Sequence, residues 1–528
     1  MSDSTATADS GLRMGTRRAR WVLFTTVLGS GLAMLDATVV NVALDRIGTD
    51  LDADFAGLQW TVNAYTLTLA SFILLGGSLS DRFGRRRVFV VGVCWFAVAS
   101  LLCGLAPNVE TLIAARALQG VGGALLTPGS LAIISASFRG SDRSAAVGAW
   151  SGLGGVAGAL GPFLGGWLVE WNWRAVFLLN LPVAVLIVVV AARHVPESRD
   201  PFAPARLDWG GTVLVVTGLG LLTYALTAAG SGADVDVWSS GVVGVAALLA
   251  FAVVERRSDH PLVPPVLFRN RQFTAVNGVT VLVYAALGVV FVLLVLQLQV
   301  VSGFSPLLAG TALLPVTVLM LAFSARVGRL ARRVGPRLLL TVGPLVAAGG
   351  VLLLSRVGED AEYASDVLPG ALLFGIGLTL LVAPLTATVL DSAEDRFAGV
   401  ASGVNNAAAR TAGLLAVAVV PVAAGLGGAD YTDPPAFSAG FRTGMLICAG
   451  LLVAGGVLAA ASVRRPLGAP DGEPRDHVDA AGPRIRIEEC VSCGVDGPLV
   501  HPRHALRSPP QQGSADLGRA GPEVPTDW

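Results

Sequence analysis

Residues 76–87 read GGSLSDRFGRRR, and residues 327–337 read VGRLARRVGPR. Each stretch follows an apolar run, and the two share the pattern Gly-x-Leu-x-x-Arg-x-Gly together with further arginine. A weak repeat between the halves of a chain is typical of transporters built from repeated helical bundles around a central site. The repeat therefore predicts two related bundles, with the same kind of loop at the same point in each.

The composition indicates that these bundles lie in a membrane. Hydrophobic residues make up 53% of the chain and charged residues 14%, whereas a soluble domain carries about a quarter charged residues. Runs of roughly 20 apolar residues are long enough to cross a bilayer as helices. Such runs occupy 21–43, 58–78, 88–106, 111–133, 144–169, 174–192, 208–228, 237–254, 273–301, 307–325, 337–355, 367–390, 398–425 and 440–463.

The sequence thus predicts an all-α polytopic membrane protein with two six-helix bundles plus two linking helices, about 14 transmembrane helices in all. After Arg464 the chain becomes rich in Pro, Gly, Asp and Arg without periodicity, which is typical of disorder. The expected segments are a cytoplasmic N-terminal tail (1–20), an N-terminal bundle (21–192), linking helices with flanking loops (193–270), a C-terminal bundle (271–463) and a disordered cytoplasmic tail (464–528).

The charges of the loops alternate along this plan. Arginine clusters such as Arg17, Arg18 and Arg20 occur in one set of loops, and acidic groups such as Asp50 and Asp52 occur in the other set. Positively charged loops stay on the cytoplasmic side of a membrane. We therefore expect a multi-pass protein of the cytoplasmic (inner) membrane with both termini in the cytoplasm.

The loop 77–87 is the first candidate site. Its glycines permit a tight turn, and Asp81 can pair with arginines of its own loop or of a neighbouring helix. A charge latch that forms in one conformation and breaks in another would serve as a gate; the alternative is a plain positive-inside anchor. The gating residues proposed here are Gly77, Asp81, Arg82, Gly84, Arg85 and Arg86.

Two ionisable residues lie deep inside apolar runs. Asp36 stands in the first run and Arg116 in the fourth, and a charge inside a membrane span is a functional candidate because its burial is costly. Desolvation favours the neutral form of a carboxyl, which suits a group that takes up and releases protons. Arg116 needs a buried carboxylate, a carbonyl or a water-filled cavity. The alternative for Asp36 is a structural carboxylate that bonds to a neighbouring helix.

The fifth run carries a series of glycines. Gly154, Gly158, Gly161 and Gly165 fall on one face of a helix, where small residues let a partner helix approach closely. The run continues through Pro162 and Gly166, and a proline inside a helix removes a backbone donor and loosens it. The sequence predicts a sliding interface here, without indicating which helix is the partner.

Together these features resemble the major facilitator superfamily, specifically its fourteen-helix drug–proton antiporter branch. The loop 77–87 is similar to the superfamily signature, and the run 112–123 resembles a motif whose arginine, here Arg116, is implicated in proton transfer. Residues 161–166 resemble the antiporter motif, and residues 35–44 resemble the helix 1 motif of the drug-exporting branch. One departure is Asp45, which follows Leu44 where the family usually has proline.

The resemblance implies a proton-coupled antiporter that exports drugs, antibiotics or related small organic molecules by alternating access. No enzyme activity, metal, cofactor or nucleic acid is expected; a proton gradient would supply the energy, and the partners would be a small organic substrate, protons and the lipid bilayer, with the chain a monomer. A proton-coupled importer of a nutrient or siderophore, or a non-transporting receptor, is the alternative. Candidate cavity residues are Asn41, Asn63, Tyr65, Asn277, Gln297 and Arg410.

Neither the substrate nor the proton stoichiometry follows from these motifs, because a dedicated self-resistance exporter and a broad multidrug pump would share all of them. Cys490 and Cys493, followed by His501 and His504, have the residue types of a zinc site. Their short spacing and Pro- and Gly-rich surroundings favour a chance arrangement.

Overall fold

A computed structural model describes residues 12–200, 207–229, 234–258, 261–393, 398–426 and 433–463. The described chain is helical, apart from connecting turns and one isolated β-bridge between Leu12 and Phe138. The expected tail 464–528, with its cysteine and histidine residues, lies outside the described residues, as do residues 1–11 of the expected N-terminal tail.

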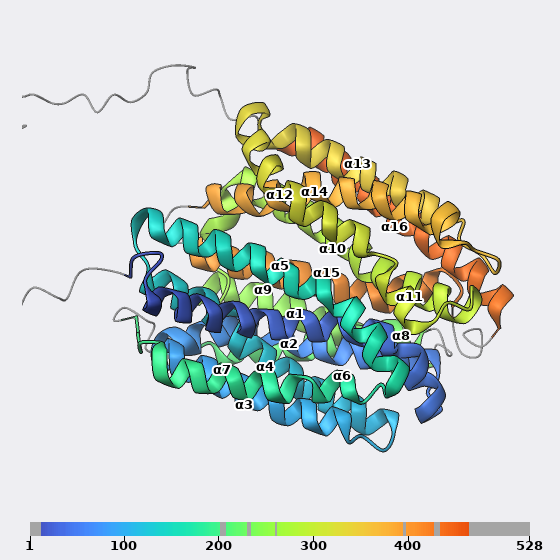
Figure 1. The fold of residues 1–528 in the computed structure, drawn as a ribbon, viewed down its shortest axis with the longest axis horizontal. Helices are drawn as coiled ribbons and strands as arrows, with labels where there is room; N and C mark the ends of the chain where they lie inside the picture. The colour runs from blue at the N-terminus through green and yellow to red at the C-terminus, as the bar shows by residue number, and fades with distance from the viewer. Residues whose placement is uncertain are drawn as a thin grey trace, which may run out of the picture. The chain divides into compact units, whose positions relative to one another are not determined.

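Figure 1 labels the helices, which are numbered in chain order. The N-terminal half contains α1 (Arg17–Leu51), α2 (Phe55–Phe83), α3 (Arg85–Gly104), α4 (Val109–Ser137), α5 (Gly140–Trp171), α6 (Ala175–Leu178) and α7 (Asn180–His194). The linking pair is α8 (Trp209–Ala228) and α9 (Val235–Arg257), followed by a 3₁₀ turn (Pro265–Arg269). The C-terminal half contains α10 (Arg271–Leu296), α11 (Pro306–Thr311), α12 (Leu314–Val334), α13 (Pro336–Leu354), α14 (Leu368–Asp391), α15 (Ala398–Ala423) and α16 (Pro434–Ser462), with π-helical turns at Gln297–Val301 and Tyr363–Val367.

Within the described residues, 13 helical segments are long and apolar enough to cross a membrane. The remaining span expected from the sequence corresponds to α5, whose 32 residues also exceed the roughly 20 that a bilayer requires. The prediction of an all-α polytopic membrane protein is confirmed.

Several helices begin or end at residues other than those at which the predicted apolar runs begin or end. The first run begins at Trp21, but α1 begins at Arg17, because the Thr16 side chain accepts a hydrogen bond from the Ala19 amide and caps the helix. Hydropathy does not detect such a cap. The run 307–325 is divided between α11 and α12, where Pro315 cannot donate a backbone hydrogen bond to the preceding turn.

The two halves form separate sets of packed helices (Figure 1). In the first, α4 packs on α2 and α3, and α1 packs on α5; in the second, α13 packs on α14 and α16, and α10 packs on α15 and α16. The linking helices α8 and α9 pack on each other, and α8 also contacts α2 and α15. Between the halves, α5 contacts α11 and α12, and α2 contacts α15.

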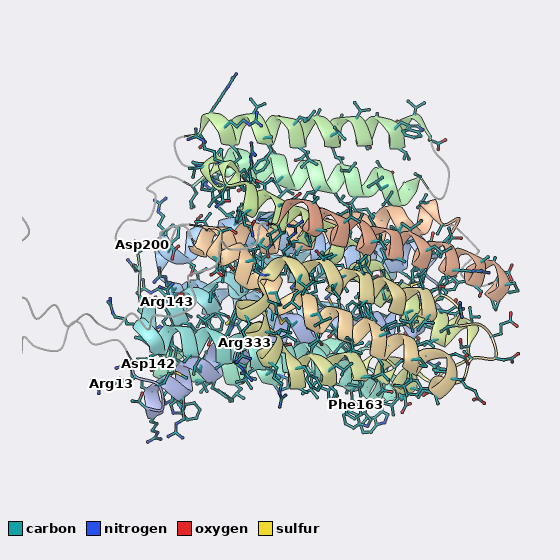
Figure 2. All side chains as sticks on the ribbon, turned by 90° about the horizontal axis from the view of Figure 1, so that it is seen from above. Arg13, Asp142, Arg143, Phe163, Asp200 and Arg333 are labelled. Carbon is teal, nitrogen blue, oxygen red and sulfur yellow. The ribbon has the colours of Figure 1, made fainter. Side chains whose placement is uncertain are left out.

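Helix direction defines two ends of the bundle. We call the end marked by Arg17, Arg82 and Arg193 the basic end, and the end marked by Asp50 and Asp52 the acidic end. Figure 2 shows Arg13, Asp142, Arg143 and Asp200 together at the basic end, far from Phe163.

Contacts between the halves include two hydrogen bonds toward the acidic end. The amide of Gln59 in α2 donates to the Val417 carbonyl of α15 at 2.8 Å. The amide of Gln299 donates to the Val42 carbonyl of α1 at 3.1 Å. In each bond a side chain from one half satisfies a backbone carbonyl of the other, so these bonds help to hold the halves together there.

Glycine permits the tightest packing inside the N-terminal half. A Cβ atom at Gly76 would lie 2.2 Å from the Ala124 carbonyl oxygen, and one at Gly120 would lie 2.3 Å from the Tyr65 carbonyl oxygen. Such distances are too short for any side chain, so α2 and α4 can pack this closely because both carry glycine at the contact. This contact holds Tyr65 beside the segment of α4 that carries Arg116.

Candidate functional site

Asp36 of α1 and Arg116 of α4 form an ion pair inside the N-terminal half. The Arg116 NH1 group donates to Asp36 Oδ2 at 2.6 Å. The Asp36 and Arg116 side chains are 0% and 1% exposed. Because removing two charges from water is costly, a buried pair persists when further hydrogen bonds satisfy both groups. The sequence singled out each residue separately, and the structure brings the two together.

Polar side chains from three further positions complete the carboxylate's surroundings. Oδ1 of Asp36 accepts hydrogen bonds from Gln119 Nε2 and Asn180 Nδ2, each at 2.8 Å. The Ser100 hydroxyl accepts from the same two amides at 3.1 and 2.9 Å and donates to the Phe177 carbonyl. Asp36 therefore accepts hydrogen bonds from three donors on its two carboxylate oxygens.

The guanidinium of Arg116 also contacts groups other than Asp36. Its NH1 group also donates to Gln119 Oε1 at 2.6 Å, and its Nε donates to the Thr61 carbonyl at 3.1 Å. The Arg116 Cζ atom lies 4.3 Å from the centre of the Tyr65 ring, close enough for a cation–π interaction. The cluster of Asp36, Arg116, Gln119, Ser100 and Asn180, here called the buried cluster, therefore joins α1, α3, α4 and α7.

Gln119, Ser100 and Asn180 were not predicted as site residues. Amides and hydroxyls occur in many membrane helices, so their residue types alone do not mark a site. Gln119 could have been identified from its spacing, because it lies three residues after Arg116 and so falls on the same helical face.

The glycines of α5 face the helix that carries Asp36. A Cβ atom at Gly161 would lie 1.9 Å from Thr38 Oγ1, and one at Gly165 would lie 3.2 Å from the backbone of Val39. These are positions two and three residues beyond Asp36 on α1. The partner helix that the sequence left open is therefore α1, while Gly154 and Gly158 lie in a part of α5 whose side-chain surroundings are outside the described residues.

The adjacent face of α5 contacts the other half of the protein. A Cβ atom at Gly166 would lie 2.5 Å from the Leu307 Cα atom, and one at Gly310 would lie 2.2 Å from the Pro162 carbonyl oxygen. The segment 161–166 thus touches α1 on one side and α11 on the other. Through it, a shift of α1 can be transmitted to the interface between the halves.

Replacing Gly166 with alanine is expected to separate the halves at the acidic end, because its new methyl group meets backbone atoms that cannot rotate away. Overpacking of this kind costs about 1–3 kcal/mol, which corresponds to a roughly 5- to 150-fold shift in a two-state equilibrium. Spin labels at Thr49 and Asp360, in a background without native cysteines, would report a longer distance. Gly148→Ala is the control, because a Cβ atom at Gly148 meets nothing within 4 Å; equal distances in both variants would contradict the expectation.

The proposed gating loop is held by contacts at the basic end. Arg85 donates to the Asp81 carboxylate at 2.8 Å, so the ion pair forms within the loop itself. Gly84 has a φ of +112°, and a Cβ atom there would lie 2.8 Å from the Glu197 carboxylate, so this position requires glycine on two grounds. In the second half Gly335 has a φ of +83°, the same left-handed sign, in keeping with the repeat.

The segment that follows α7 secures this loop. The backbone amides of Arg86 and Arg87 donate to the Glu197 carboxylate at 3.1 and 3.2 Å, and Arg86 NH1 donates to the Val195 carbonyl. Glu197 lies at the start of α3, where a negative charge is favourable. Of the other gating residues, Arg82 is exposed, and the nearest atom to a Cβ at Gly77 would be in Pro128, at 3.9 Å.

Among the candidate cavity residues, three have defined partners. Tyr65 is 2% exposed, belongs to the surroundings of Arg116 and donates its hydroxyl to the Ala33 carbonyl. Asn277 accepts from Asn405 at 3.1 Å, which links α10 to α15. Gln297 is fully buried in the C-terminal half, where it donates to Val357 and Ser438.

The other three are less satisfied. Asn63 is fully buried, and within the described chain neither of its side-chain amide atoms has a hydrogen-bond partner; the same holds for Asn41 Oδ1. Arg410 is half-buried on α15. In the described residues no carboxylate forms an ion pair with Arg410.

Among the described residues no group of three or more His, Cys, Asp or Glu side chains is placed to hold a metal ion. The chemistry available at the buried cluster is therefore that of one carboxyl, one guanidinium and neutral amides and hydroxyls.

Comparison with known proteins agrees with this architecture. The family model described as Major Facilitator Superfamily matches residues 26–417. A puromycin resistance protein of Streptomyces alboniger is 38% identical over 409 residues, covering 76% of this chain and 81% of the relative. A tetracenomycin C resistance and export protein of Streptomyces glaucescens is 34% identical, with 77% and 76% covered.

Solved structures show the same fold at low sequence identity. The POT family transporter PepTSo has a TM-score of 0.62 at 15% identity, with 84% of this chain and 98% of that chain covered. A bacterial homologue of the human lysosomal transporter Spinster, inward-facing and occupied, has a TM-score of 0.60 at 17% identity, with 85% and 98% covered.

The family model covers most of the membrane helices, and the curated relatives are resistance and export proteins rather than enzymes. The chain belongs to the Major Facilitator Superfamily, and its relatives place it in the drug-exporting branch of that family.

Proposed function

We propose that this protein is a proton-coupled antiporter that exports a small organic antibiotic or drug across the cytoplasmic membrane. The observation that supports this most strongly is the Asp36–Arg116 pair, buried beyond the reach of water and satisfied by amides on neighbouring helices. Burying two charged side chains costs free energy. A role in coupling explains the pair, because protonation of the carboxyl would change the packing of several helices.

Protonation of Asp36 is the proposed coupling step. In the charged form Oδ2 accepts from Arg116 and Oδ1 accepts from two amides. A neutral carboxyl loses its attraction for the guanidinium, and its new hydroxyl hydrogen must find an acceptor among groups that now all donate to it. The packing of α1 against α4 and α7 then changes, so each protonation state favours its own arrangement of α1.

Two contacts connect this step to the substrate path. The α5 segment 161–166 touches α1 just beyond Asp36 and α11 in the other half, so movement of α1 alters the interface between halves. Tyr65 of α2 stacks on Arg116, and α2 contacts α15 of the other half, so we propose that displacement of Arg116 also alters the packing at the interface between the halves. We propose that Arg410, Asn63 and Asn41 face the substrate path.

In the proposed orientation the basic end is cytoplasmic, as the positive-inside rule requires. The Asp81–Arg85 pair and the contacts of Glu197 hold the gating loop in one conformation, and their rupture accompanies the opposite one. Protons that enter from the acidic end would drive substrate out of the cell.

The substrate class is proposed from the relatives and from the site. The relatives are named for resistance to, or export of, the antibiotics puromycin, tetracenomycin C, methylenomycin A and cephamycin. The half-buried Arg410 can donate hydrogen bonds to a substrate, so we propose that the substrate carries acceptor-rich groups.

A resistance panel tests the proposal. Expression in a bacterial strain that lacks its own exporters is expected to raise the inhibitory concentration of at least one of these antibiotics by fourfold or more. Inverted vesicles should then accumulate that compound when acidified inside. Loss of the compound from such vesicles would instead identify an importer, and no movement in either direction would argue against transport.

A further inference from the structure

The basic end contains a cavity that the proposed transport cycle does not use. It has a volume of about 590 Å³ and is formed by three parts of the chain: the first turns of α1, the start of α3 and the end of α7 with the residues after it. The lining residues are Arg17, Arg18, Trp21, Arg86, Arg193, His194, Val195 and Pro196. We call this cavity the arginine pocket.

The arginine pocket has an excess of positive charge. No carboxylate is among its lining residues, and the nearby Glu197 is shared between Arg86 and Arg87 at 3.8 Å from each guanidinium. In the part of the chain that the structure describes, Arg17, Arg18 and Arg193 form no ion pair. Like charges converging in this way repel one another, so an anion bound among them would be stabilised.

An aromatic wall lies beside these arginines. The Trp21 ring stacks on the His194 ring with their centroids 4.8 Å apart, and Trp21 also meets Phe24 edge-on at 5.9 Å. Tryptophan is enriched where the hydrocarbon of a membrane meets its headgroups. Trp21 therefore indicates that the pocket lies at headgroup depth rather than in the hydrocarbon.

The helix faces below the pocket are apolar and exposed. On α7, Val189 and Leu186 lie four and seven residues before Arg193, on the same helical face, and are 41% and 46% exposed. On α1, Phe24 lies seven residues after Arg17 and is 39% exposed. Basic groups at the helix ends and exposed apolar side chains one to two turns deeper match an amphiphile, with an anionic head and hydrocarbon chains.

We propose that the arginine pocket binds the phosphate headgroup of an anionic phospholipid, whose acyl chains lie against Phe24, Leu186 and Val189. Arg17, Arg18 and Arg193 supply charge-assisted hydrogen bonds to the phosphate, and Trp21 packs beside the glycerol region. Because Arg86 belongs both to this pocket and to the gating loop, the bound lipid contacts the segment that holds Asp81.

Native mass spectrometry of the full-length protein in detergent tests this proposal, with phosphatidylglycerol and phosphatidylcholine of identical acyl chains as probes. The wild type is expected to retain phosphatidylglycerol at least fivefold more than phosphatidylcholine. The double variant Arg17→Gln/Arg193→Gln should reduce this preference to near one, whereas Arg17→Lys/Arg193→Lys should retain much of it. Arg256→Gln/Arg257→Gln is the matched control, since it removes two exposed charges from the end of α9 and should leave the preference unchanged.

Several results would overturn the proposal. Equal retention of both lipids would exclude a headgroup site, and an unchanged preference in a folded Arg17→Gln/Arg193→Gln protein would place the lipid elsewhere. An equal loss in the α9 control would indicate attraction to overall charge. Competition by free glycerol phosphate as strong as that by the lipid would identify a site for soluble phosphate instead.

Discussion

Asp36→Asn is expected to abolish substrate export driven by a pH gradient. Accumulation in vesicles that are acidic inside should fall at least tenfold, to the level of vesicles without the protein. Asparagine cannot take up a proton, and it offers one oxygen where Asp36 accepts three hydrogen bonds on two. The buried cluster then has a single protonation state, and the gradient can no longer act on it.

The measurement is substrate uptake into inverted vesicles at matched protein levels. Asp45→Asn is the control, because it makes the same substitution on the same helix two and a half turns away. Its uptake should remain within twofold of the wild type. Export by Asp36→Asn at the wild-type rate would remove Asp36 from the coupling mechanism, and an equal loss in Asp45→Asn would attribute the effect to α1 in general.

The second large effect concerns stability, and it depends on which partner of the pair is removed. Leaving one member of a buried ion pair alone costs about 3–5 kcal/mol. In Asp36→Asn the lone partner is Arg116, whose guanidinium stays charged at any accessible pH. In Arg116→Gln the lone partner is a carboxyl, which can become neutral by binding a proton. Asp36→Asn should therefore destabilise the protein more than Arg116→Gln.

Thermal unfolding of the purified variants would check this order. Arg116→Gln should lose more stability at alkaline than at acidic pH, because its lone carboxyl then has to remain charged. The double variant Asp36→Asn/Arg116→Gln should unfold at a higher temperature than Asp36→Asn alone, since it contains no unpaired charge. Additive losses in the double variant would mean that the two side chains do not interact as the 2.6 Å contact indicates.

The sequence alone was sufficient to predict the membrane helices. A lipid-exposed backbone has to satisfy its own hydrogen bonds, so a long apolar run forms a helix. Long apolar runs such as 337–355 therefore correspond to helices, here Pro336–Leu354. Helix ends were less predictable, since α1 begins four residues before its apolar run, where the Thr16 side chain caps it. Local side-chain capping contributes nothing to hydropathy.

The candidate site could be predicted from the sequence in part. Asp36 and Arg116 could be identified because isolated charges in apolar runs are rare, whereas Asn180 is an ordinary polar residue whose role depends on tertiary packing. It meets Asp36 across 144 residues of chain, and no local pattern encodes that contact. Gly161 could be assigned to a helix interface, but its partner α1 became known from the structure.

The central claim is that Asp36, held by Arg116 in a site closed to water, exchanges the proton that drives export. Its most direct test is to measure proton movement in liposomes that contain the purified protein and a pH-sensitive dye, after adding a gradient of the antibiotic that gives the largest resistance. The account predicts that protons move opposite to the antibiotic in the wild type and do not move in Asp36→Asn. Antibiotic movement without proton movement in the wild type, or unchanged proton movement in Asp36→Asn, would contradict it.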